Sequence, residues 1–127
     1  SIACRMAAQG QAYNIPFTGL TGFVYAGDVA EILCQAMLED FQGAPVINMP
    51  GITATVDDFN LEIQNQMPDA ILSSEGSPLP VFGKIPTELS WSLSNNHEPT
   101  PLRTGIANTL EYYKSGNVNP QNSDDVL

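Results

Sequence analysis

Few residues in this 127-residue chain have the types and spacing that catalysis requires. The single histidine, His97, stands beside Glu98 in an asparagine-rich stretch, where an exposed turn residue is favoured over a catalytic base. Ser73, Ser74 and Ser77 have no neighbouring histidine that could activate a hydroxyl as a nucleophile. The sequence therefore supports no hydrolase, and we assign no catalytic residue.

Two acidic pairs invite comparison with metal sites and paired catalytic carboxylates. Asp28 and Glu31 have the spacing of a helix capping box in which Asp28 is the N-cap. Asp57 and Asp58 follow Thr55, a good N-cap, and fall in a first helical turn, where the helix dipole favours negative charge. No histidine or cysteine is placed to join Asp57 and Asp58 as metal ligands. We therefore expect helix caps and no metal.

The cysteines and the tyrosine pair are interpreted structurally. Cys4 and Cys34 are far apart in apolar helical surroundings, so each is expected to be a buried, reduced thiol, which fits a cytoplasmic protein. Tyr112 and Tyr113 are interpreted as one core and one boundary aromatic of a helix.

The formal net charge of −10 argues against nucleic acid and anionic membranes as partners. The basic residues that could meet phosphates are Arg5, Lys84, Arg103 and Lys114. Arg103 sits unfavourably near the start of a predicted helix, and we expect a salt bridge to Glu98. No segment has the length of a transmembrane helix, and no signal-peptide pattern opens the chain.

The length suits one domain with a modest core. Because the chain begins without a methionine and directly in a helix-like pattern, we expect it to be a piece of a longer protein.

The first elements follow from apolar periodicity and from glycine and proline. Residues 1–9 form a predicted helix that Gly10 ends, with Ile2, Ala3 and Met6 on one side. Residues 13–17 read as a short strand, which Pro16 restricts to a sheet edge. Residues 18–22 are a turn-rich loop, flexible enough to line a cleft.

The remaining predicted elements alternate between helix and strand. A helix after Asp28 carries its apolar face on Val29, Ile32, Leu33, Ala36 and Met37. A buried strand is predicted at 46–49, around Val46 and Ile47, and a short one at 70–73. A helix after Thr55 presents Val56, Phe59, Ile63 and Met67 and ends at Pro68. The last helix has Thr100 as cap, Pro101 at its first position, and an apolar stripe of Leu102, Ile106, Leu110 and Tyr113.

Two of these segments resemble a known family. The stretch 23–51 resembles the Phe-x-Tyr, Asp-Val-Ala, helix and Asn-x-x-Gly pattern of extended short-chain dehydrogenases/reductases, the NAD-dependent epimerase/dehydratase family. The segment 100–113 resembles the closing helix of that family, which often opens Thr-Pro-Leu-x-x-Gly. The matching residues of the first stretch are Phe23, Tyr25, Asp28, Val29, Ala30, Asn48 and Gly51. The resemblance covers most of residues 1–114, and residues 115–127 are predicted to be a mobile tail.

The resemblance implies an α/β fold (α+β in isolation): the C-terminal, substrate-binding portion of a Rossmann-type epimerase, with four to five helices and a few short strands. It also implies NAD or NADP in the full-length protein, bound by an N-terminal nucleotide-binding half. No Gly-x-Gly-x-x-Gly occurs in this chain. The family's catalytic Tyr-x-x-x-Lys is absent too, because Leu110 and Pro80 precede the two lysines by four residues. We therefore expect no cofactor-binding residue here and an inactive isolated chain.

The resemblance places the substrate against the loop 17–23 and the turn 49–51. Thr21 stands where nucleotide-sugar members carry an arginine, and no arginine occurs between Met67 and Pro86. Without a bidentate guanidinium clamp, a small polar or sugar-like substrate is favoured over a nucleotide diphosphate. The predicted substrate-binding residues are Phe17, Thr18, Leu20, Thr21, Phe23 and Gly51.

The alternative hypothesis is a non-catalytic binding or assembly module that only shares the fold. In either case the helix after Asp28 and the strand at 46–49 are expected to pack on the nucleotide-binding sheet of the full protein. Alone they would expose an apolar face and a strand edge, so we predict that the isolated chain self-associates.

Overall fold

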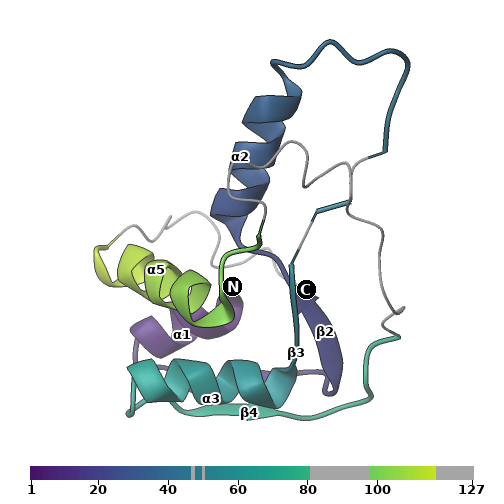
Figure 1. Cartoon of the computed structure of the whole chain (residues 1–127). Coiled ribbons are helices and arrows are strands. Elements are labelled where there is room, and N and C mark those ends of the chain that lie inside the picture. The colour runs from purple at the N-terminus through teal and green to yellow at the C-terminus, as the bar shows by residue number, and fades with distance from the viewer. Residues whose placement is uncertain (47, 50, 81–97, 117–127) are drawn as a thin grey trace, which may run out of the picture.

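The computed structural model of the chain describes residues 1–46, 48–49, 51–80 and 98–116. This described part contains four helices and four short strands, which confirms the predicted α/β class with few helices and short strands (Figure 1). In chain order the elements are α1 (Ile2–Ala8), β1 (Tyr13–Ile15), β2 (Leu20–Phe23), α2 (Ala26–Ala36), β3 (Ile52–Thr55), α3 (Val56–Gln66), β4 (Leu72–Ser74) and α5 (Leu102–Lys114).

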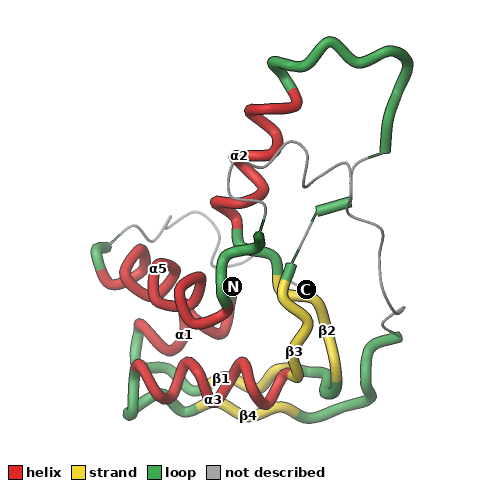
Figure 2. The backbone as a smooth tube through the Cα atoms, in the orientation of Figure 1, coloured by secondary structure: helices red, strands yellow, loops and turns green. Residues whose placement is uncertain are grey.

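The strands form two separate two-stranded sheets (Figure 2). β1 pairs in parallel with β4, from Tyr13 opposite Leu72 to Ile15 opposite Ser74. This confirms the predicted strands near residues 13 and 72. Within the described residues β1 has β4 as its one neighbour, so it is an edge strand there, as expected. β2 pairs antiparallel with β3 over residues 20–23 and 52–55, so the predicted loop 18–22 is in large part a strand.

The predicted buried strand at 46–49 is wrong. Val46 is 83% exposed, Asn48 and Met49 are not in a strand, and Ile47 lies outside the described residues. The extended segment that does pair begins at Ile52, where β2 offers a complete antiparallel partner. An apolar run alone does not identify a strand, because the hydrogen-bond ladder of a sheet needs an adjacent backbone segment with free N–H and C=O groups.

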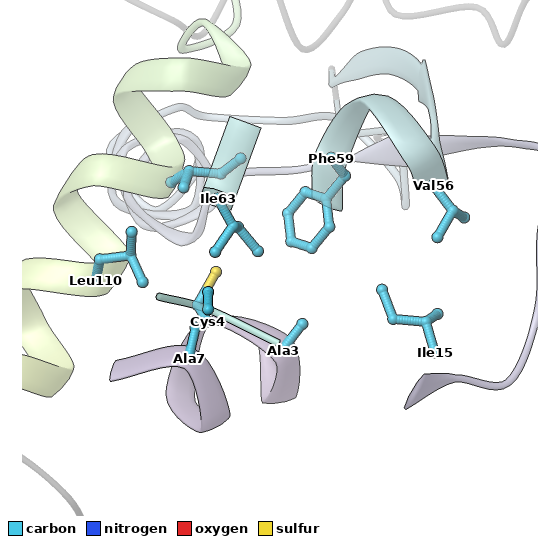
Figure 3. Packing of buried hydrophobic residues seen from close by; sticks show 10 residues of the cluster. Ala3, Cys4, Ala7, Ile15, Val56, Phe59, Ile63 and Leu110 are labelled. Carbon is cyan, nitrogen blue, oxygen red and sulfur yellow. The ribbon is translucent and has the colours of Figure 1, made fainter. Parts of the chain in front are cut away.

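The core lies between α1, α3 and α5, with one residue from β1 and one from the turn before β4 (Figure 3). The small side chains Ala3, Cys4 and Ala7 form the inner face of α1 and let α5 approach closely. This face differs from the predicted one, since Ile2 is 36% exposed and Met6 is only half-buried. The buried cluster consists of Ala3, Cys4, Ala7, Ile15, Val56, Phe59, Ile63, Ala70, Ile106 and Leu110.

The predicted cap of α3 is confirmed. The Asp58 backbone N–H donates to Thr55 Oγ1 at 3.0 Å, and the Thr55 N–H donates to Asp58 Oδ2 at 3.2 Å, which completes a capping box. The neighbouring Asp57 accepts a hydrogen bond from the Ser74 hydroxyl at 2.6 Å and thereby ties β4 to α3. Neither carboxylate belongs to a metal-binding group among the described residues.

The predicted caps of the other two helices are wrong. α2 begins at Ala26 with Tyr25 as N-cap, so Asp28 lies inside the first turn and Glu31 in the second. α5 begins at Leu102 with Pro101 as N-cap, and the Thr100 side chain does not cap it. The reason is the same at both sites: Asp28 and Thr100 bond to each other across the fold instead of to their own helices.

α2 projects away from the body formed by the other described elements (Figures 1 and 2). On it only Ile32 is buried, whereas Leu33 is 53% exposed; Met37, just beyond its end, is 84% exposed. Because α2 projects from the other described elements, Cys34 is exposed, contrary to expectation. Cys4 is buried as predicted. Within the described ranges no helix has both the length and the apolarity needed to cross a membrane.

Candidate functional site

A cavity of about 600 Å³ opens between the start of α1, the junction of β2 with α2, and the inner side of α5. This volume lies in the range of about 300–1,000 Å³ that is usual for small-molecule sites. Apolar and aromatic side chains make up most of its wall. The residues that line it are Ser1, Ile2, Ala3, Cys4, Tyr13, Ile15, Pro16, Phe17, Phe23, Val24, Tyr25, Ala26, Ile52, Val56, Phe59, Thr100, Leu102, Gly105, Ile106, Asn108, Thr109, Tyr112 and Tyr113.

One wall of the cavity is aromatic. The rings of Phe23 and Phe59 stack with centroids 4.6 Å apart and an interplanar angle of 11°. β2 holds the first ring and α3 the second, so the β2–β3 sheet and α3 fix each other. Phe17 also packs against the core cluster beside this wall.

Tyr25 forms the corner between β2 and α5. The Tyr25 ring lies on α5 at Gly105, where a Cβ atom would stand 3.4 Å from Tyr25 Cδ2, an ordinary van der Waals contact. One turn further along, Asn108 donates a hydrogen bond from Nδ2 to the Tyr25 hydroxyl at 3.3 Å. A Cβ at Gly27 would stand only 2.5 Å from Tyr25 Cε1, so a side chain at Gly27 would displace the ring.

Asp28 and Thr100 join the same two segments. The Asp28 carboxylate accepts the Thr100 backbone N–H at 2.8 Å and the Thr100 hydroxyl at 2.5 Å. Both residues are half-buried, which strengthens these bonds relative to bonds made in water. The Tyr25 contact and this pair together fasten the start of α2 to the start of α5 at the rim of the cavity.

No charged side chain lines the cavity in the described part of the chain. Arg103 is 83% exposed and lies 3.8 Å from Glu62 Oε1, so the predicted salt bridge to Glu98 is replaced by one to α3. The hydroxyl of Thr109 donates to the Gly105 carbonyl at 2.7 Å and is therefore already committed. Apart from the N-terminal charge at Ser1, the described wall therefore carries no charge.

Cys4 supplies the one thiol on this wall among the described residues. Burial raises the pKa of the Cys4 thiol, against smaller opposing effects of a hydrogen bond with Ser1 and of the N-terminal charge. The thiol thus stays protonated near neutral pH and is a poor nucleophile. Its place in the core cluster gives it a packing role.

The predicted substrate-binding residues divide into two groups. Phe17 and Phe23 line the cavity, whereas Thr18, Leu20, Thr21 and Gly51 do not. Thr18 donates from Oγ1 to the Gly76 carbonyl at 2.9 Å, and Leu20 and Thr21 pair with β3. Gly51 is pressed against the Phe23 carbonyl, where a Cβ would stand 2.7 Å away.

Several residues of the cavity were not predicted, notably Tyr25, Gly105, Asn108 and the start of α1. A signal did exist, because Tyr25 and Gly105 belong to the two segments that carry the family resemblance. Ser73, Ser74 and Ser77 do not line the cavity, and Ser73 donates to Asn14 Oδ1 at 2.9 Å. His97 lies outside the described residues.

Comparison with known proteins gives a structural match without a sequence match. No protein-family model matches the chain, and no curated protein matches its sequence. A solved structure of a partial consensus L-threonine 3-dehydrogenase (E-change) superposes with a TM-score of 0.62 at 12% identity, over 90% of this chain. The chain spans 41% of that chain's length. The chain thus has a fold like part of a dehydrogenase.

Proposed function

We propose that this chain is the substrate-binding portion of an NAD(P)-dependent dehydrogenase or epimerase/dehydratase-like protein. Residues outside the chain would supply the nucleotide site and the catalytic groups. The observation that carries the proposal is a ligand-sized cavity in a fold that matches less than half of a dehydrogenase chain. The meeting of the two family-like segments at the rim, through Tyr25 with Gly105 and Asp28 with Thr100, supports it.

The cavity does not suit a dinucleotide by itself. A pyrophosphate needs a glycine-rich turn at a helix N-terminus or cationic side chains. The sequence has no Gly-x-Gly-x-x-Gly, and no lysine or arginine is among the cavity residues described above. We therefore place no step of cofactor chemistry on these residues.

A nucleotide-binding portion would also explain the bare side of α2. Four large apolar side chains on α2 and on the segment after it are 53–84% exposed: Leu33 on the helix, and Met37, Leu38 and Val46 beyond it. Large apolar side chains gathered on one projecting element are typical of a surface that packs against another body. In this proposal that body is the nucleotide-binding half.

The non-catalytic module remains a second candidate. It is favoured by a cavity wall that, in the described part of the chain, has no charged side chain and has one thiol, which burial keeps protonated. The discriminating observation is the reading frame ahead of Ser1. A strand, a glycine-rich turn and a later Tyr-x-x-x-Lys are expected there for the enzyme. A stop codon or an unrelated domain would support the module.

The cofactor assignment is tested by calorimetry on the 127-residue chain. Titration with NAD and with NADP is expected to give no heat of binding, whereas the protein extended through the upstream reading frame is expected to bind one of them. Tight dinucleotide binding to the chain alone would show that the nucleotide site has been misplaced.

A further inference from the structure

We infer that the cavity selects uncharged ligands with an apolar or aromatic body and a single alcohol or ketone oxygen. This assignment names the substrate class and rests on the proposed function only in treating the bound molecule as a substrate. It differs from the small polar or sugar-like substrate that the family resemblance favours.

The first reason is charge. An ionised group loses its hydration when it enters an apolar site, and it needs a partner charge or several hydrogen bonds in return. No charged side chain lines the cavity among the described residues, and Asp28 at the rim is engaged with Thr100. The charge of the Ser1 amino group is on the main chain and is removed in the test below. Amino acids, sugar acids and phosphates would therefore be bound weakly.

The second reason is the largely apolar wall, in which the oxygen- and nitrogen-bearing side chains are those of Ser1, Asn108, two threonines and four tyrosines. A sugar carries several hydroxyls, each of which needs a partner once it is buried. The hydroxyls of Thr100 and Thr109 are already donating to Asp28 and to the Gly105 carbonyl. The wall is otherwise dominated by rings such as Phe17, Phe23 and those of the tyrosines, which suit a flat apolar body.

The third reason is the polar pair at the corner of the cavity. The Tyr25 hydroxyl accepts from Asn108 Nδ2, so its own proton is free to be donated to a ligand oxygen. The Asn108 carbonyl oxygen can in turn accept from a ligand hydroxyl. A ketone would use the first of these bonds, and the corresponding alcohol could use both.

The test uses the 127-residue chain with its Ser1 amino group acetylated, which removes the N-terminal charge at the cavity wall, and a panel of matched ligands. Binding is followed by the shifts of amide signals in ¹H–¹⁵N NMR spectra. The panel is 4-phenyl-2-butanone, 4-phenyl-2-butanol, butylbenzene, 4-phenylbutyrate, threonine and glucuronate. The ketone and the alcohol are expected to bind most tightly and to shift signals around Phe59 and Ile106. The three charged compounds are expected to bind at least about tenfold more weakly.

One variant tests the polar pair and a second serves as its control. Asn108→Leu removes the acceptor that only the alcohol uses, so it is expected to weaken the alcohol by about two- to tenfold, the usual contribution of a hydrogen bond, and to leave the ketone and butylbenzene unchanged. Thr104→Val is the matched control, because Thr104 is exposed on the same helix and does not line the cavity. Circular dichroism verifies that both variants are folded.

Three results would overturn the inference: tighter binding of threonine or glucuronate than of the ketone, an equal loss of butylbenzene in Asn108→Leu, or no binding of any compound. Failure of the proposed function is a separate result. If the neutral ligands bind as expected and the upstream-extended protein binds no dinucleotide, the ligand class stands and the dehydrogenase assignment fails.

Discussion

The bonds between Asp28 and Thr100 make a sharp prediction, because they join elements that are 72 residues apart. Asp28→Ala removes both acceptor bonds at once. Thr100→Val removes only the hydroxyl and leaves the backbone N–H bond in place. Asp28→Ala therefore loses two hydrogen bonds and Thr100→Val loses one.

The expected magnitudes follow from the two bonds. A hydrogen bond to a charged group contributes about 1.5–3 kcal/mol, and an ordinary one about 0.5–1.5 kcal/mol. Because both side chains are only half-buried, we take values near the lower ends. Asp28→Ala is expected to lower the free energy of unfolding by about 2–3 kcal/mol and Thr100→Val by about 1 kcal/mol. The double variant should cost no more than Asp28→Ala alone, which gives a coupling energy of about 1 kcal/mol.

The assay is urea denaturation followed by far-UV circular dichroism, with linear extrapolation for the wild type, both single variants and the double variant. Asp69→Ala at an exposed position is the control for loss of an acidic side chain and is expected to change stability by less than about 0.5 kcal/mol. Additive effects in the double variant would refute the pairing. So would an Asp28→Ala cost no larger than that of the control.

Three further predictions concern acid stability, thiol reactivity and association. Hydrogen bonds from the Thr55 side chain and backbone lower the pKa of Asp58. The stabilisation by the Asp58 carboxylate is therefore present above the unfolded pKa of about 4 and is lost as the pH falls through the lowered folded pKa. Asp58→Asn should flatten this part of the dependence of the melting temperature on pH, and an unchanged dependence would contradict the prediction. Ellman's reagent should modify exposed Cys34 quickly and buried Cys4 only after unfolding, whereas two fast reactions in the native state would refute this. The chain should self-associate in light scattering and Met37→Lys should reduce it, while a monomeric wild type at high concentration would count against the proposed role of the apolar surface.

Much of the local structure could be predicted because it depends on neighbours in sequence. The helix that begins after Thr55 was predicted with its cap and buried face, since Thr55 and Asp58 are three residues apart and the apolar period is unbroken up to Ile63. The strand at Tyr13–Ile15 was predicted from the same kind of short-range pattern. The α/β class follows from this order of elements.

The errors all concern partners that are distant in sequence. The Asp28 carboxylate could accept hydrogen bonds either from its own helix or from Thr100. Only the fold brings the Thr100 backbone nitrogen within 2.8 Å of Asp28 Oδ2. The apolar run at Val46 looked like a strand, but the segment that pairs is the one that lies beside β2. Cys34 was expected to be buried, yet α2 has no described body against its outer side.

The sequence by itself determined the class of fold, the helix after Thr55 and the family-like segments around Tyr25 and Thr100, because helix periods, caps and turns are set within a few residues. Only the tertiary structure decided that those two segments meet and that one face of α2 is left bare. It also decided that a cavity of about 600 Å³, with no charged side chain among the described residues, lies beside these segments. The physical reason is that a cavity and its electrostatics are properties of side chains gathered from distant parts of the chain, which no local pattern records.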